Sequence, residues 1–216
     1  MTTTTRLIIL HTTKYSENSL ILHTLSDEYG RRGFLARGLG KSVSAAMFLP
    51  LNILEADIVE SSKSKLFLAK NFHSLKALNG IRDNIYKNSI SLFISEVLFR
   101  AIKEGGREEG LFEWCAGQIS LLDAMEDSFA NFHLTFLLEL AVNMGFAPSL
   151  GGLAPFAGEN LRAIGELLSQ DFSHAMLIPL TGQKRSEIAD SLLRYIEYHS
   201  ESTLNIRSLE VLKELF

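Results

Sequence analysis

The stretch RLIILHTTKYSENSLILHTLSDEYGRRGFLARGL, residues 6–39, decides the fold of the first third of the chain. Apolar runs lie at residues 6–15, 18–25 and 31–39, and the short segments between them (SEN and DEYG) are rich in turn-forming residues. This pattern predicts three consecutive strands joined by tight turns. Because the turns are too short for crossover helices, the strands are predicted to pair antiparallel.

Two further strands are predicted after this stretch. FLPLNILEADIVES, residues 48–61, partly alternates apolar and polar positions, and LFLAKNFHSL, residues 66–75, follows a polar turn. Five short strands with no helix between most of them indicate a small antiparallel sheet. Closure into a five-stranded barrel is the expected arrangement, because a closed barrel has no exposed edges.

Beyond about residue 80 the apolar spacing becomes that of helices. The stretch from Ser128 to Met144 is apolar on nearly all sides, which predicts a central, buried helix. The sequence therefore predicts an α+β protein, with a β-barrel domain at 1–78 and an all-α domain at 79–216. The other predicted helices are 81–104, 108–125, 161–169, 184–200 and 208–216, the last capped by Ser208, and SLGGLAPFAGEN, residues 149–160, is predicted to be a loop.

Composition and charge bound the class of protein. The chain has 216 residues and one cysteine, Cys115, which excludes a disulfide framework and a cysteine-based zinc site and favours a reducing cytoplasm. No apolar run approaches the roughly 20 residues of a membrane span, and no N-terminal signal is expected. The net charge of −4 hides an asymmetry, since residues 1–78 carry +4 and residues 79–216 carry −8. Such a sign change indicates two domains with different partners.

No pattern in the chain assembles a catalytic or metal site. LARGLGKS, residues 35–42, ends like a phosphate-binding P-loop, but Leu35 stands where that pattern needs glycine. The six histidines lack the spacing of metal ligands, and His133 is expected to be a hydrogen-bonded core residue. Cys115 lies in an apolar helical stretch and is expected to be an inert buried thiol. We therefore predict no enzyme activity and no cofactor.

Binding remains, because a small barrel with basic loops is a common scaffold for single-stranded nucleic acid. Adjacent residues of a strand point to opposite faces, so Arg31 and Arg32 are not expected to line one groove. Among the aromatic side chains, Phe34 and Phe67 are expected in the barrel core, and Tyr29 is favoured for base stacking. The candidate cations are Lys14, Arg31, Arg32, Arg37, Lys41, Lys63, Lys65 and Lys70, and the candidate stacking residues are Tyr15, Tyr29, Phe34, Phe67 and Phe72.

The order of these segments resembles a known family. LHTTKYSENSLILHTLSDEYGRRGFLARGLGKSVS followed by LPLNILEADIV resembles the N-terminal domain of the recombination mediator RecO. FHSLKAL resembles that family's transition into a helical domain, LAVNMGFAPSL resembles its L-x-x-x-G-x-x-P landmark, and SLEVLKELF resembles its end. The resemblance covers nearly the whole chain.

The resemblance implies a function in homologous recombination and DNA repair. It implies an OB-fold domain, a helical domain, and binding and annealing of single- and double-stranded DNA. It also implies work with RecR, and in many bacteria RecF, to displace single-strand-binding protein and load RecA, in the cytoplasm on the nucleoid. The alternative is an adaptor that bridges repair partners with little DNA affinity of its own. The residues expected to contact DNA are Lys14, Arg31, Arg32, Arg37 and Lys41.

Two further expectations come with the resemblance. Many relatives carry a four-cysteine zinc site after the landmark, but residues 145–160 of this chain contain no cysteine, so we predict no zinc. The family also docks the acidic tail of single-strand-binding protein, which an acidic helical domain should repel unless a basic pocket receives it. Arg82, Lys87, Arg100 and Lys103 lie on the first predicted helix, and Arg100 and Lys103 are the residues expected to bind this partner.

Overall fold

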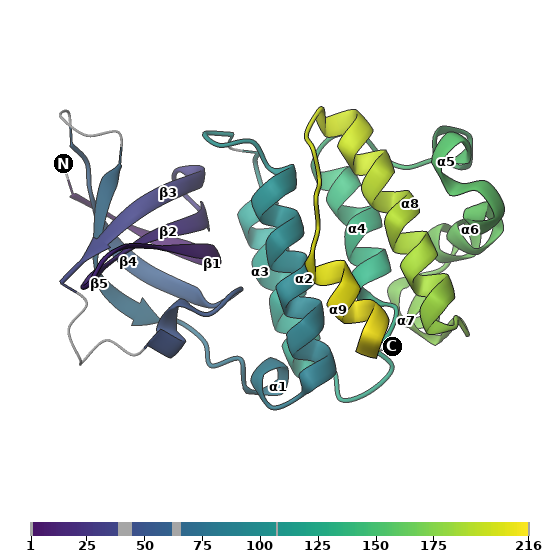
Figure 1. Ribbon diagram of the computed structural model, residues 1–216, viewed down its shortest axis with the longest axis horizontal. Helices are drawn as coiled ribbons and strands as arrows, with labels where there is room; N and C mark the ends of the chain where they lie inside the picture. Colours follow the sequence, from purple (N-terminus) through teal and green to yellow (C-terminus); the bar gives the residue numbers. More distant parts are fainter. Residues whose placement is uncertain (1, 39–44, 62–65, 107, 216) are drawn as a thin grey trace. The chain divides into compact units, whose positions relative to one another are not determined.

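The computed structural model describes residues 2–38, 45–61, 66–106 and 108–215. The described chain contains a β-barrel followed by helices (Figure 1), which confirms the predicted fold class. The strands are β1 (Thr2–Ser16), β2 (Ser19–Ser26), β3 (Gly30–Arg37), β4 (Ile53–Val59) and β5 (Phe67–Ser74), with a 3₁₀ turn, η1, at Ala45–Phe48.

The five strands close in the order β1-β2-β3-β5-β4. One long strand, β1, pairs with β2 on one side and β4 on the other, so that Leu7 faces both Ser26 and Leu54. The prediction of an entirely antiparallel barrel was wrong at one place, because β3 and β5 pair in parallel. An odd number of strands cannot alternate direction all the way around a closed ring, so one neighbouring pair must be parallel.

Alternation along the strands builds the barrel core. Leu7 and Ile9 of β1 point inward together with Phe34 and Ala36 of β3, and all four are fully buried. Ile8 and Leu35, which point to the other face, are buried too, so these parts of β1 and β3 are covered on both faces. The expectation that Phe34 belongs to the core is confirmed, and Phe67 packs against the same cluster as a partly buried side chain.

The helices differ from the prediction at their ends, in the division of one predicted helix, and in two added helices at 150–157 and 172–177. The predicted helix 81–104 divides into α1 and α2 because the side chain of Asn84 accepts hydrogen bonds from the backbone N–H groups of Tyr86 and Lys87 and starts a new helix. The helices are α1 (Asn79–Arg82), α2 (Ile85–Ala101), α3 (Leu111–Ala124), α4 (Phe132–Asn143), α5 (Leu150–Ala157), α6 (Leu161–Ser169), α7 (Phe172–Leu177), α8 (Gly182–Ser200) and α9 (Ser208–Leu215), with a 3₁₀ turn, η2, at Gly158–Asn160.

The prediction of a loop at 149–160 was wrong. Ser149 has extended backbone, and its hydroxyl accepts a hydrogen bond from the backbone N–H of Gly152, which starts helix α5. Two glycines and Pro155 have low helix propensity, so the residue preferences of this segment do not predict a helix. The predicted central helix is confirmed in α4, whose residues from Phe132 to Leu138 are all buried. It starts later than predicted, and Ser128 before it has a positive φ of 55°.

The chain divides into two compact units. One unit contains residues 1–78 and 102–119, and the other contains residues 79–101 and 120–216. The predicted division at residue 78 was therefore incomplete, because the segment from Ile102 to Ile119 returns to the barrel. Arg6 of β1 shows this return, since its guanidinium lies 4.9 Å from the centre of the Phe112 ring and pairs with Glu113. No described helix has both the length and the apolar character that a membrane crossing requires.

Candidate nucleic-acid interface

Arg31 is held by the segment that returns to the barrel. Its side chain is only 14% exposed, and its guanidinium lies 3.6 Å from the carboxylate of Glu104. The backbone joins in, because Gly105 N–H donates to the Arg31 carbonyl at 2.9 Å and Arg31 N–H donates to the Gly106 carbonyl at 3.3 Å. Burial lowers the pKa of Arg31, and the charge of Glu104 opposes this shift. In this structure Arg31 therefore joins the barrel to its covering segment.

Arg32 lies on aromatic rings. Its guanidinium carbon is 3.9 Å from the centre of the Phe67 ring and 6.0 Å from that of Tyr29. The Tyr29 ring in turn meets Phe67 edge-on at 5.9 Å, and its hydroxyl donates to Glu60 at 3.0 Å. A guanidinium over a ring face is attracted by the ring quadrupole. Tyr29 and Phe67 therefore form a platform on which Arg32 already stacks, instead of two free stacking surfaces.

Lys14 and Arg37 lie at neighbouring strand ends and are exposed. Lys14 of β1 faces Leu20, and Arg37 of β3 faces Ser19, so β2 alone separates them. Two strand spacings place their backbones about 10 Å apart. A cavity of about 250 Å³ lies beside Lys14, lined also by the β1–β2 turn and Phe48. Lys41, and likewise Lys63 and Lys65, lie outside the described residues.

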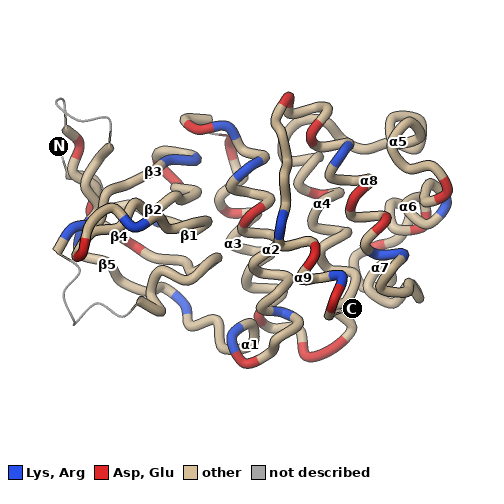
Figure 2. Tube along the Cα trace, in the orientation of Figure 1, with Lys and Arg blue, Asp and Glu red and all other residues tan. Residues whose placement is uncertain are grey.

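The basic residues expected to contact DNA therefore do not form one continuous surface. Arg31 and Arg37 are six residues apart on β3, about 20 Å along an extended strand. Figure 2 shows basic positions at separate places on the barrel, with acidic positions among them. The structure places Lys14 and Arg37 at neighbouring strand ends but on opposite faces, since Lys14 is in register with Leu20 and Ala36. Arg31 and Arg32 lie at the other end of β3, also on opposite faces, as their adjacency predicts.

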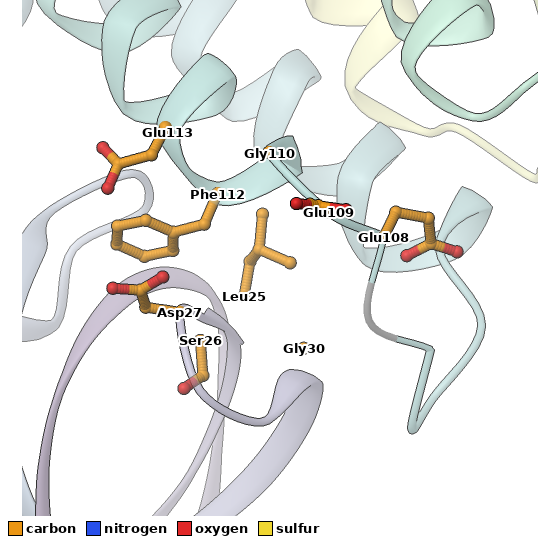
Figure 3. Close-up of a pocket in the computed structure, with 9 residues that line it drawn as sticks. All are labelled: Leu25, Ser26, Asp27, Gly30, Glu108, Glu109, Gly110, Phe112 and Glu113. Atoms are coloured by element: carbon orange, nitrogen blue, oxygen red, sulfur yellow. The ribbon is translucent and has the colours of Figure 1, made fainter.

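The described cavity of about 450 Å³ near the start of β3 is acidic (Figure 3). The Phe112 ring lies between the carboxylates of Asp27 and Glu113, and Leu25 forms part of the wall. Such a surface repels phosphate groups. The remaining lining residues are Ser26, Gly30, Glu108, Glu109 and Gly110.

The four residues proposed for a basic pocket do not all lie exposed on one helix. Lys87 is buried, and its ammonium donates to the backbone carbonyl of Asp123 at 3.1 Å. Lys103 lies beyond the end of α2, which stops at Ala101. Arg100 is on α2, where its guanidinium lies 3.4 Å from the carboxylate of Glu96. Binding of a partner by Arg100 and Lys103 stays a prediction, but the two residues do not share a helix.

The carboxylate of Glu96 caps the N-terminal end of α9. Its carboxylate accepts hydrogen bonds from the backbone N–H of Ser208 at 2.8 Å and from the Ser208 hydroxyl at 2.6 Å. The predicted cap of α9 is thus supplied by α2, and Ser208 acts as a donor to it. Burial alone would raise the pKa of Glu96, yet the bonds from Ser208, the backbone N–H of Arg207 and the charge of Arg100 hold this pKa below its ordinary value.

We expect Glu96→Gln to lower the free energy of unfolding by about 1–2 kcal/mol at neutral pH, because charged acceptors make the stronger hydrogen bonds. The pKa of Glu96 is lower in the folded state, so this contribution is present above the ordinary glutamate pKa of 4.5. It is lost as the pH falls through the folded-state value. Urea unfolding of both proteins across pH, followed by circular dichroism, measures this difference.

The control for this experiment is Glu210→Gln, which changes an exposed glutamate in the first turn of α9, the helix that Glu96 caps. We expect it to change stability by less than about 0.5 kcal/mol. A gap between wild type and Glu96→Gln that persists unchanged at acid pH would contradict the capping role.

Cys115 and His133, the remaining candidates for a catalytic or metal-binding role, are core residues. Cys115 is fully buried, and burial raises the pKa of its thiol, as expected for an inert side chain. His133 is buried, and burial together with the charge of Arg185 lowers its pKa to about 3 despite a hydrogen bond with the backbone of Ala130. Within the described ranges, no three His, Cys, Asp or Glu side chains gather as metal ligands. Residues 145–160 offer no thiol or imidazole, so they do not fit the zinc that many relatives carry.

Sequence reasoning missed the segment from Ile102 to Gly106. It reads as the end of a helix, and nothing in its spacing shows that Glu104 meets Arg31 of the barrel. The pair of glycines at 105–106 is the one available signal, since Gly105 has a φ of +83° that ends the helical path.

Comparisons with known proteins agree with this architecture. Residues 1–75 match the family described as Recombination protein O N terminal, and residues 82–151 match Recombination protein O C terminal. A protein of Bacteroides fragilis named DNA repair protein RecO is 30% identical, over 97% of both chains. Proteins of the same name from Flavobacterium psychrophilum and Porphyromonas gingivalis are 30% and 28% identical, over 98% of each chain. The chain therefore belongs to the RecO family of DNA repair proteins.

Proposed function

We propose that this protein is a non-enzymatic mediator of recombinational repair that binds single- and double-stranded DNA through its barrel. In this role it promotes annealing of complementary strands and, together with RecR, helps to load RecA onto strands coated by single-strand-binding protein. RecF takes part where it is present, and the site of action is the nucleoid in the cytoplasm. Membership of the RecO family supports the repair role, and the resemblance described above supports these partners.

The observation that carries DNA binding is the exposed pair Lys14 and Arg37 on a barrel of OB-fold strand order. Barrels of this kind bind oligonucleotides along β2 and β3 and at the loops that flank them, and Lys14 and Arg37 border the β1–β2 loop. Cations at this place would neutralise phosphates, so that two strands could approach closely enough for their bases to pair.

The test is binding of a fluorescent single-stranded oligonucleotide titrated across salt. Four to six phosphate contacts give a log–log slope of about −3 to −4 for the wild type. We expect Lys14→Gln/Arg37→Gln to weaken binding about tenfold at low salt and to flatten the slope by about 1.4, which corresponds to two lost contacts. Substitution of Arg31 and Arg32 is a poorer test, because it also removes the Glu104 pair and the Phe67 stack.

The control is Arg162→Gln/Lys184→Gln, which removes the same charge from helices α6 and α8. Equal affinities for both double variants would place the DNA elsewhere on the protein. The adaptor alternative has an observation in its favour, namely that Arg31 and Arg32 already have partners within the barrel unit. Absence of binding by the wild type at low salt would favour that alternative.

A further inference from the structure

Three strands bring His11, His23 and Arg31 to one outer face of the barrel. His11 of β1 and His23 of β2 are register partners, and their rings stack with centres 5.8 Å apart. Arg31 of β3 faces Leu25, two residues along β2 from His23. Thr13 adds a hydroxyl 3.2 Å from Nε2 of His23. In OB-folds this side of β2 and β3 is where nucleic acid lies.

The Glu104 carboxylate occupies this face. One of its oxygens lies 3.6 Å from the Arg31 guanidinium, and the other lies 3.8 Å from the point where a Cβ on Gly33 would stand. Gly33 is the register partner of His23. Burial, together with the charges of His11 and Arg31, lowers the pKa of His23, and the charge of Glu104 acts against this shift. Glu104 is thus the anion that faces the cationic side of β2 and β3.

We propose that the Glu104 carboxylate stands where a DNA phosphate would bind and competes with DNA for Arg31. This inference rests on the proposed function and adds a form of self-regulation to it. Carboxylate and phosphate are interchangeable partners for a guanidinium, since both accept charge-assisted hydrogen bonds from it. A protein that masks its own site in this way holds a strand less tightly and releases it more readily.

A phosphate can replace the Glu104 carboxylate at Arg31 with little rearrangement of the protein. The Glu104 side chain is 64% exposed and the Arg31 side chain 14% exposed, so the carboxylate can swing into solvent while the guanidinium stays in place. The covering segment is held by its backbone, through the two hydrogen bonds that join Gly105 and Gly106 to Arg31. A phosphate therefore has to displace one side chain, while the segment itself stays in place.

The acidic cavity sets the direction of the strand. Asp27, Glu108, Glu109 and Glu113 line the cavity near the start of β3 (Figure 3). Arg6 pairs with Asp27 and Glu113, and this place still keeps a net negative charge. Phosphates are repelled there, so a strand that reaches Arg31 continues toward the other end of β3, where Lys14 and Arg37 lie. Glu104 then stands at the border between the basic and the acidic parts of the barrel unit.

The experiment measures binding of a fluorescent single-stranded oligonucleotide by the full chain carrying Glu104→Gln. Glu126→Gln is the control, because it removes the same charge from an exposed residue that does not line the acidic cavity. We expect Glu104→Gln to bind about three- to fivefold tighter than the control at low salt. Its log–log salt slope should be steeper by up to about 0.7, the value for one added phosphate contact.

A second variant tests the route through Arg31. In Glu104→Gln/Arg31→Gln the gain should disappear, because the released cation is no longer there. Equal affinities of Glu104→Gln and Glu126→Gln, with wild-type binding intact, would overturn the competition and leave the proposed function standing. Failure of every variant to bind at low salt would overturn the proposed function, and the competition with it.

Discussion

Replacement of Asn131 by leucine is expected to lower the free energy of unfolding by about 3 kcal/mol. Asn131 is 1% exposed, and its amide donates to the carbonyls of Ala175 at 3.0 Å and Ile178 at 2.9 Å. Its oxygen accepts a hydrogen bond from Nε of Arg185 at 2.9 Å. Leucine has a similar volume but none of these groups, so one buried and two partly buried polar partners lose their bonds.

Urea unfolding followed by circular dichroism measures this effect. Asn143→Leu is the control, since Asn143 is the last residue of α4 and its amide donates to the carbonyl of Glu139 within that helix. We expect the control to change stability by less than about 1 kcal/mol. Similar losses in the two variants would show that Asn131 has no special role in joining α4 to α7 and α8.

Gly80→Ala is expected to cost about 3 kcal/mol, because the added methyl group has no room. A Cβ at Gly80 would lie 2.0 Å from the backbone carbonyl oxygen of Asp123, and backbone atoms cannot rotate away. Two hydrogen bonds hold α1 and α2 against Asp123. The Asp123 carboxylate accepts from the N–H of Ile81 at 3.0 Å, and its carbonyl accepts from Lys87.

Gly117→Ala is the control, and we expect it to raise the free energy of unfolding instead of lowering it. Gly117 lies in α3 with no atom within 4 Å of its would-be Cβ. Alanine there should raise stability by about 0.5–1 kcal/mol, the usual gain for this exchange in a helix. Thermal unfolding of both variants compares them directly. An equal gain in both would show that α1 can move away from Asp123 at little cost.

Local patterns predicted most of the elements correctly. The apolar runs at 6–15, 18–25 and 31–39, and the turn-forming residues of SEN and DEYG between them, predict β1 to β3 because strand and turn preferences are local properties. The all-round apolar character of 128–144 likewise predicts the buried helix α4. The helix α5 was missed because its start depends on the hydroxyl of Ser149 in a run of poor helix formers.

The roles of polar side chains depended on distant partners. Asn131 precedes the first residue of α4, yet its side chain does not cap that helix and instead bonds the carbonyl of Ala175 in α7 and the guanidinium of Arg185. Ser208 looks like the cap of α9, but Glu96, far away in the chain, supplies the acceptor. Such pairings join residues over separations that no periodicity encodes.

The sequence by itself determined the class of the protein: a strand-rich basic first third, a helical acidic remainder, and an order of segments typical of the RecO family. Only the tertiary structure decided which of the basic residues remain available. Arg31 is matched with Glu104 and Arg32 with Phe67, whereas Lys14 and Arg37 stay exposed. The reason is physical, because secondary structure follows from neighbours along the chain, while the surroundings of a charge follow from segments that folding brings to it.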